Sequence, residues 1–259
     1  MSLLLRTTAL MLLLLSRAPV MAAVPLISSS TEDNREESRQ NEVSSKLFRH
    51  SLSGLYGISS QNAPITQPYQ DFDVLYSKAH QAQIELETLC KSTALLTGTQ
   101  AYFAGAKSHQ RALEKVALEL DGQAERITDL ARATIVAHDV ASLVTAYETL
   151  NREATIVKVK NRFKNPAESG YRDLNVLVQL PKTKIIAEVQ FHLAAIAEVK
   201  SGAEHQLYEQ IQNIERTARQ EQRALSEWEL AQIAKIRSTS RDLYQQAWQP
   251  YITTHIQAA

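Results

Sequence analysis

The sequence is poor in the residues that would impose cross-links, chain breaks or an overall electric field. It has one cysteine, seven glycines and seven prolines in 259 residues, and its 28 basic residues balance its 28 acidic ones. The single thiol, Cys90, excludes an internal disulfide and a metal cluster built from several thiolates. A zero formal net charge argues against DNA binding and requires any phosphate site to be local. The scarcity of glycine and proline predicts a helix-rich protein.

The first 22 residues have the pattern of an export signal. Arg6 precedes an apolar run over residues 9–15, and Val20-Met21-Ala22 supplies the small residues of a cleavage site. The apolar run is shorter than the ~20 residues that a membrane-spanning helix needs, although an uncleaved anchor is the alternative. We expect cleavage near Ala22 or Ala23 and no stable membrane anchor afterwards. The sequence therefore predicts an exported protein, either periplasmic or secreted.

Helical periodicity dominates both ends of the remaining chain. A polar stretch over residues 23–70 has few bulky apolar residues and predicts a flexible linker. Apolar residues then recur at helical spacing over residues 71–96, where Gly98 ends the run, and over residues 101–120. Cys90 falls within the first of these helices among leucines, which predicts a buried structural thiol. Helical spacing returns after Leu193 and continues to the C-terminus.

The middle of the chain changes to a period of two. This alternation predicts strands over residues 131–136, 155–163, 172–180 and 184–192, with a short helix at 140–150. Pro181-Lys182-Thr183 joins the last two strands tightly, which predicts an antiparallel hairpin. We therefore expect an α+β fold in which helices at both ends of the chain frame a sheet.

Three basic residues precede the first strand at intervals of four. Lys107, Arg111 and Lys115 line one face of the predicted helix, where successive cations suit a polyphosphate. A solvated helix face is the alternative, because Glu114 and Glu119 lie nearby.

Acidic and polar residues mark two of the predicted strands. Glu188, Gln190 and His192 share one face of their strand, and a carboxylate there is able to hold Mg²⁺ together with phosphate oxygens. The alternative is a solvated sheet face. Asp129 stands at the start of another strand, either as a turn residue or as a second metal ligand.

A basic loop leads into the hairpin and contains a candidate base-stacking ring. Tyr171 follows Gly170, which allows a close backbone approach, and Leu174, Val176 and Val178 already supply the apolar side of the next strand. We therefore expect the Tyr171 ring to face a ligand and to stack on a base. A core tyrosine at the start of a strand is the alternative.

In this order the motifs resemble the synthetase domain of RelA/SpoT proteins. The resemblance covers about residues 105–210. It rests on the cationic helix and on five blocks: Ile127-Thr128-Asp129-Leu130, Val159 to Phe163 with Asn165-Pro166, Gly170 to Leu174, Glu188-Val189-Gln190, and His205 to Glu209. Members of that family have a nucleotidyltransferase-like mixed sheet. They use Mg²⁺ to move pyrophosphate from ATP to the ribose 3′ hydroxyl of GDP or GTP.

The resemblance implies a role for each matching residue. Asp129 and Glu188 are expected to be catalytic metal ligands, with Gln190 supporting Glu188, and Tyr171 to stack on the acceptor base. The other nucleotide-binding candidates are basic residues in or beside the motifs: Lys107, Arg111, Lys115, Lys158, Lys160, Arg162, His192 and His205. On this basis the synthetase-like domain spans residues 71–225, and a C-terminal helix spans residues 226–259, beginning with a capping box of Ser226 and Glu229.

The chain departs from the family pattern at four positions. Gly105 and His192 each replace an expected arginine, Ala167 replaces a loop lysine, and Asn175 replaces a histidine. These changes weaken the expected phosphate clamp and leave the acceptor open, as in divergent, toxin-type relatives.

We therefore expect an exported effector or toxin that transfers pyrophosphate from ATP, with GDP or GTP as the favoured acceptor. Three alternatives stay open at this point. The domain binds nucleotide without transfer, it acts on an adenine nucleotide or an RNA end, or the chain is a helical secreted protein with an incidental hairpin.

Overall fold

The computed structural model describes residues 42–61 and 64–253. The chain separates into two compact units, residues 1–44 and 45–259, and the fold below is that of the second. The predicted export signal lies outside the described residues. No helix of the described ranges combines the length and apolarity needed to cross a membrane.

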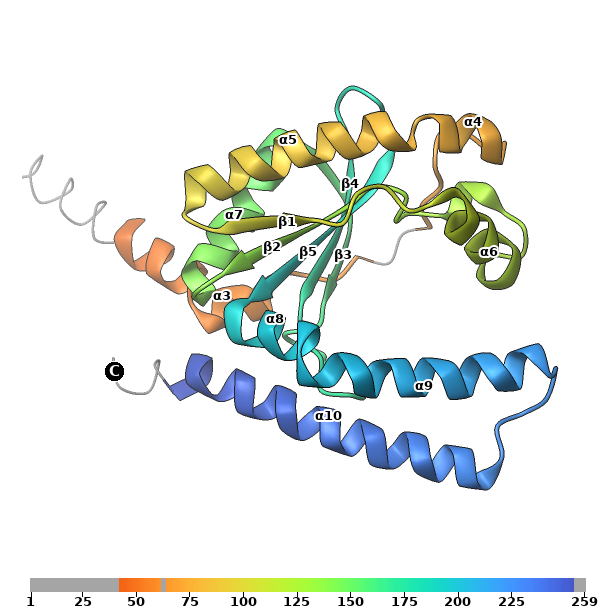
Figure 1. Ribbon diagram of the computed structural model, residues 1–259. Coiled ribbons are helices and arrows are strands. Elements are labelled where there is room, and N and C mark those ends of the chain that lie inside the picture. Colours follow the sequence, from red (N-terminus) through yellow and green to blue (C-terminus); the bar gives the residue numbers. More distant parts are fainter. Residues whose placement is uncertain (1–41, 62–63, 254–259) are drawn as a thin grey trace, which may run out of the picture. The chain divides into compact units, whose positions relative to one another are not determined.

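The second unit contains helices at both ends of the chain and strands mainly in its middle (Figure 1). The strands are β1 (Gln100–Phe103), β2 (Arg132–Ala137), β3 (Thr155–Asn161), β4 (Leu174–Gln179) and β5 (Ile186–Leu193). The helices are α3 (Leu52–Gly57), α4 (Phe72–Ser77), α5 (Ala79–Thr97), α6 (His109–Glu119), α7 (Val140–Glu153), α8 (Ala194–Ser201), α9 (Ala203–Gln220) and α10 (Glu227–Thr253), with a short 3-10 turn, η1 (Ala124–Arg126).

The five strands form one mixed sheet in the order β1-β2-β5-β4-β3. β2 and β5 run parallel at its centre, with Arg132 opposite Glu188 and Thr134 opposite Gln190. The other neighbouring pairs are antiparallel, including the predicted hairpin of β4 and β5. The α+β fold with a mixed sheet framed by helices is thus confirmed.

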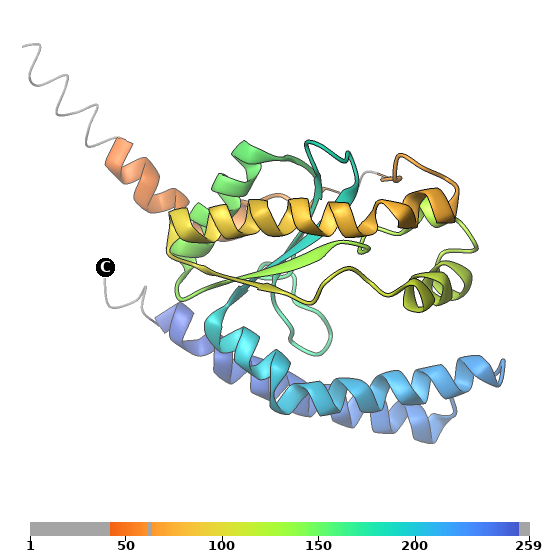
Figure 2. The same ribbon diagram turned by 45° about the horizontal axis from the view of Figure 1, so that its top comes forward.

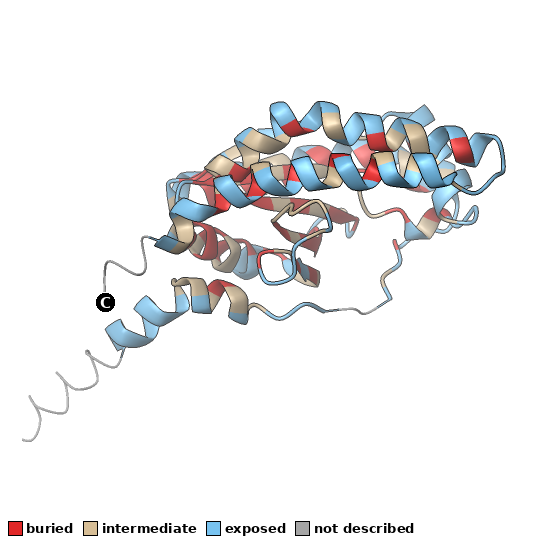
Figure 3. Ribbon diagram, turned by 90° about the horizontal axis from the view of Figure 1, so that it is seen from below, coloured by how far each residue is buried: buried red, intermediate tan, exposed pale blue. Residues whose placement is uncertain are grey.

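The two faces of the sheet differ in what covers them. α5 and α7 pack on one face, where the Phe191 ring of β5 lies 6.3 Å from the Tyr147 ring of α7 (Figure 2). The opposite face carries polar residues and meets α8, whose Lys200 donates a hydrogen bond to Gln190. In Figure 3 the strands between these helices are coloured largely as buried. The period of two in β5 thus separates a core face from a polar face.

The last two helices form a long hairpin. Ile211 of α9 packs with Ile233 and Ile236 of α10 in a small apolar cluster. The predicted capping box begins α10: the Ser226 amide donates to the Glu229 carboxylate at 2.8 Å, and the Glu229 amide donates to the Ser226 hydroxyl at 3.3 Å. The hairpin thereby gives α9 a fixed support along its length.

Two helical predictions need correction. The helix expected over residues 101–120 is a strand followed by a shorter helix, because β1 pairs antiparallel with residues 133–136 of β2 and Gly105 adopts a left-handed φ of 73° before α6. The helix expected over residues 71–96 is divided at Lys78 into α4 and α5. Gly98 does end α5, with a φ of 64°.

Cys90 is the buried thiol that the helical pattern predicts. It has no solvent exposure, and burial, with a smaller contribution from Glu87, raises its pKa to about 12. A thiol that remains protonated in this way is structural and unreactive.

The polar segment at residues 23–70 is not entirely a linker. α3 lies within it, and Leu55 of α3 is completely buried in the main core, while Gln67 donates hydrogen bonds to the carbonyls of Ile127 and Ile186. The low apolar content of this segment predicted a linker, because it gave no sign of the few residues that contacts with distant segments hold in place.

Leu55→Ala is therefore expected to lower the free energy of unfolding by ~2 to 5 kcal/mol, because it empties a buried site. Leu47→Ala is the matched control, since Leu47 is 70% exposed, and its effect is expected to stay within ~0.5 kcal/mol. Urea denaturation of both variants measures the difference. Equal stabilities would show that α3 is not part of the folded core.

Candidate functional site

Asp129 lies between two lysines just before β2. Its Oδ2 atom is 3.1 Å from Lys107 Nζ and 2.9 Å from Lys115 Nζ, and all three side chains are largely buried. Burial alone would raise the pKa of Asp129, but the two lysines outweigh that effect and hold the pKa below its ordinary value. Asp129 is therefore ionised.

The second oxygen of Asp129 has no partner. Oδ1 is buried and accepts no hydrogen bond from any described residue. An unpaired carboxylate oxygen fits a ligand for Mg²⁺, which needs one or two carboxylates and takes its other ligands from phosphates and water. The described residues contain no group of three or more His, Cys, Asp and Glu side chains arranged to hold a metal. Asp129 would thus hold Mg²⁺ jointly with a bound phosphate.

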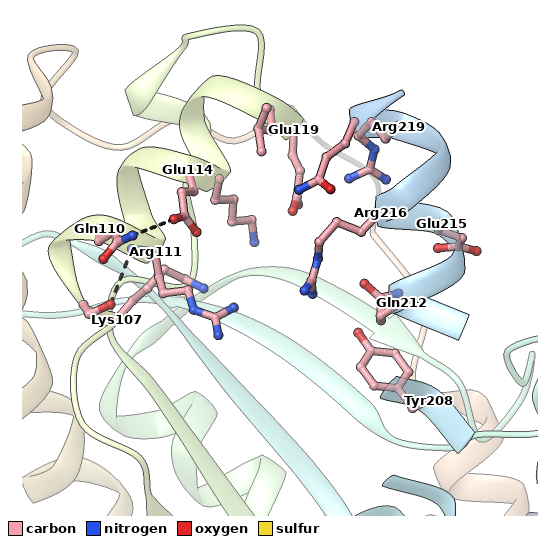
Figure 4. Close-up of a pocket in the computed structure, with 14 residues that line it drawn as sticks. Lys107, Gln110, Arg111, Glu114, Glu119, Tyr208, Gln212, Glu215, Arg216 and Arg219 are labelled. Atoms are coloured by element: carbon pink, nitrogen blue, oxygen red, sulfur yellow. Dashed lines mark hydrogen bonds between the residues drawn. The ribbon is translucent and has the colours of Figure 1, made fainter. Parts of the chain in front are cut away.

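A pocket of about 920 Å³ opens beside this cluster, between α6 and α9 (Figure 4). The three predicted cations Lys107, Arg111 and Lys115 line it together, as their spacing indicates. α9 forms the opposite wall and adds Arg216 and Arg219. The pocket is large enough for a nucleotide, and its positive side chains suit a polyphosphate.

A second pocket of about 330 Å³ lies on the polar face of the sheet. Glu188 lines it and accepts hydrogen bonds from Asn175 and from Gln190, the latter at 3.1 Å. Lys200 of α8 donates to Gln190 at 2.8 Å, and burial lowers the pKa of this lysine. Arg132 also lines the pocket, and its buried Nε atom has no hydrogen-bond partner among the described residues.

The two pockets lie on adjoining stretches of backbone. Asp129 is followed closely by Arg132, and the Glu188 amide donates to the Ala131 carbonyl at 3.0 Å. The Lys107 amide donates to the Leu130 carbonyl at 2.8 Å, which fixes the loop before α6 against the same segment. Asp129 and Glu188 make no direct contact, so their convergence on one Mg²⁺ stays a prediction.

The environment of Tyr171 differs from the prediction. Its ring is packed against the core, 5.6 Å from the Tyr244 ring of α10 and 5.7 Å from His192. Its hydroxyl donates to Asp173 at 2.9 Å and lies 2.6 Å from His192 Nε2. The ring is therefore only partly exposed, because α10 folds back over the start of β4, and its stacking on a base stays a prediction.

His192 and Arg162 belong to the same buried network. His192 is 1% exposed, and burial, with the nearby Lys200 and Arg162, lowers its pKa to about 3. Arg162 forms a 2.6 Å ion pair with Asp173, which is completely buried. The His192 ring is thus held in the interior and the Arg162 guanidinium is paired with Asp173, so a nucleotide contact by either side chain stays a prediction.

The other three basic candidates form no hydrogen bond or ion pair with this network among the described residues, although the nearby Arg162 lowers the pKa of Lys160. Lys160 is exposed and stands opposite Asn175, on the polar face of the sheet. Lys158 lines a separate pocket beside Thr128. His205 is exposed on α9, pairs with Glu209 at 3.3 Å and lines neither of the two main pockets.

Several pocket residues had no role in the sequence prediction. Tyr102, Arg132 and Lys200 line the smaller pocket, and Arg216 and Arg219 line the larger one. The only available sequence signal was the spacing of Arg216 and Arg219, three apart on one helix face. The others come from separate elements that meet only through the sheet.

The buried state of His192 predicts a pH-dependent stability. Its folded pKa of about 3 lies below the ordinary value of 6.5, so the unfolded chain binds one more proton between these values. Acidification from pH 7 to pH 5 is then expected to cost ~2 kcal/mol of unfolding free energy through this residue.

Denaturation at several pH values compares the wild type with His192→Gln, whose stability is expected to fall less steeply. His205→Gln, at an exposed histidine, is the control and is expected to keep the wild-type slope. Identical slopes for all three proteins would contradict the buried, neutral state of His192.

Comparisons with known proteins agree with this geometry. No protein-family model matches the chain. Its sequence is 32% identical over 119 residues to the (p)ppApp synthetase toxin Tas1 of Pseudomonas aeruginosa strain UCBPP-PA14, and the match covers 46% of this chain and 26% of that protein. The chain thus matches about a quarter of the length of this curated relative.

Among the solved structures, one superposes well enough to show the same fold. In the complex between the Type VI effector Tas1 and its immunity protein, a chain that is 23% identical superposes with a TM-score of 0.52, covering 73% of this chain and all of that one. The small alarmone synthetase 2 from Bacillus subtilis is 19% identical, with a TM-score of 0.47 over 66% of this chain and 94% of that one. The resemblance indicated by the motifs is confirmed, and the chain has the fold of a RelA/SpoT-type synthetase domain.

Proposed function

We propose that this protein transfers pyrophosphate from ATP to a hydroxyl group of a second nucleotide. The observation that carries the proposal is Asp129, whose ionised carboxylate lies between Lys107 and Lys115 at a cationic pocket and keeps one buried oxygen unpaired. Transfer of phosphoryl groups depends mainly on positioning and charge neutralisation, which this arrangement supplies. Mg²⁺, when bound, would neutralise further phosphate charge.

The residues divide the reaction between the two pockets. The acceptor hydroxyl oxygen attacks the β-phosphorus of ATP, the bond from that phosphorus to the α,β-bridging oxygen breaks, and AMP leaves. Lys107 and Lys115 hold the phosphates, while Glu188 takes the proton of the attacking hydroxyl. Asn175 and Gln190 fix the Glu188 carboxylate by hydrogen bonds, so that it is oriented before the acceptor arrives.

For the acceptor we favour an adenine nucleotide over the guanine nucleotide expected from the motifs. The guanine expectation came from the resemblance of the motifs, and the Tyr171 ring that was expected to stack on the acceptor base packs against Tyr244 and His192. The curated relative is named for (p)ppApp, an adenine product. GDP and GTP remain the competing acceptors.

The test is an assay with γ-labelled ATP and Mg²⁺, alone or with ADP, AMP, GDP or GTP. ATP alone is the arm in which one ATP donates and a second accepts. We expect AMP release with label transfer to adenine acceptors, and a loss of ~100-fold or more in Asp129→Asn and Glu188→Gln. Glu227→Gln, at an exposed acid of α10 outside both pockets, is the charge-matched control.

Near-normal turnover in either acidic variant, with an unchanged melting temperature, would refute the assigned roles. Nucleotide binding without AMP release in any arm would show a binding domain that does not transfer. Label transfer to GDP or GTP alone would restore the guanine acceptor.

We also propose that the protein is exported and acts as a toxin. The support is the signal-like pattern of residues 1–22 and the word toxin in the name of the relative. Protein recovered from the exported fraction is then expected to begin near Ala23 or Val24, as measured by intact mass. Retention of Met1 in that fraction would argue against cleavage and export by this signal.

A further inference from the structure

The wall that α9 contributes to the larger pocket is a continuous polar stripe. Tyr208, Gln212, Arg216 and Arg219 recur at intervals of three or four and line the pocket together. Figure 4 shows the side chains of Arg216 on α9 and Arg111 on α6 extending into the space between the two helices. The described residues form no hydrogen bond or ion pair across this space. The two walls thus face each other without a direct polar link.

Two of the three acidic residues that line the pocket have an ion-pair or hydrogen-bond partner within the protein. Glu215 forms an ion pair with Arg237 of α10 at 3.7 Å, outside the stripe, and Glu114 accepts a hydrogen bond from Gln110 at 3.0 Å. Lys107 and Lys115 are engaged by Asp129. Several charged side chains around the pocket therefore already interact with other residues of the protein.

Three guanidinium groups in the pocket have no such partner. In the described part of the chain, the side chains of Arg111, Arg216 and Arg219 form no ion pair or hydrogen bond. Each offers five N–H donors in a planar fork that matches phosphate oxygens. A single exposed arginine is usually solvated and does not by itself indicate a binding site. Three arginines that reach one cavity from two separate helices indicate an anionic ligand.

α9 is also held firmly enough to act as a wall. Ile211 packs against Ile233 and Ile236 of α10, and Arg223, in the loop after α9, donates two hydrogen bonds of 2.8 Å to Glu229 of α10. A supported helix loses little freedom when a ligand binds, so its contacts contribute more to affinity.

We propose that Arg216 and Arg219 bind the polyphosphate of the donor nucleotide from the side opposite α6. This inference rests on the proposed function and names a part of its site. A triphosphate is longer and more highly charged than the single phosphate of AMP, so it is better suited to contact arginines on both walls. The α9 arginines therefore favour the donor over the spent product and help AMP to leave.

The test uses inorganic tripolyphosphate, because its binding requires neither transfer nor an acceptor. Titration calorimetry is expected to show that Arg216→Gln and Arg219→Gln each weaken tripolyphosphate binding by roughly tenfold, since each removes charge-assisted hydrogen bonds. AMP affinity is expected to change by less than about threefold. Lys235→Gln is the control, because Lys235 is exposed on α10 and outside the pocket.

The outcomes separate this inference from the proposed function. Loss of tripolyphosphate binding in both arginine variants, with unchanged melting temperatures and a normal Lys235→Gln, supports the α9 wall even if the wild type transfers nothing. Wild-type affinity in the Arg216→Gln/Arg219→Gln double variant overturns it, as does a wild type that does not bind tripolyphosphate. An equal loss in Lys235→Gln would reduce the effect to general electrostatics and also overturn it.

Discussion

The parallel pairing of β2 with β5 is the contact on which the site depends. It joins residues 132–137 to residues 188–193 at the centre of the sheet. Because side chains alternate along both strands, one register decides that Ala133 and Val189 enter the core and that Arg132 and Glu188 meet on the other face. A shift of one residue would exchange the two faces and remove the smaller pocket.

The same pairing explains how the two pockets adjoin. The segment before β2 carries Asp129 toward α6, and the strand itself carries Arg132 toward Glu188. Two substrates of a transfer reaction must lie next to each other. Here one short chain segment contributes residues beside both pockets. The lysines on Asp129 keep it ionised despite its burial, so the segment presents a fixed negative charge among cations.

A second, largely buried network of Arg162, Tyr171, Asp173 and His192 supports the sheet near the end of β5. Asp173 is buried, and Arg162 pairs with it while Tyr171 donates a hydrogen bond to it. Burial raises the pKa of Asp173, while Arg162 and Tyr171 oppose that effect. Removal of one partner from a buried ion pair strongly destabilises a fold, because the other charge is left unpaired. The pair of Arg162 and Asp173 therefore fixes how the basic loop packs. Arg162 and Tyr171, both candidates for nucleotide binding, thus also take part in the packing of the sheet.

The sequence by itself determined the features that arise from local spacing. The period of two placed Glu188 and Gln190 on the polar face, the interval of four placed Arg111 and Lys115 at one pocket, and Gly98 ended α5. Tertiary structure decided what depends on contacts between distant segments. β1 exists because β2 pairs with it, Tyr171 is packed because α10 folds over it, and Arg216 reaches the pocket because α10 supports α9. Periodicity reports which face a residue occupies, but not which element will cover that face.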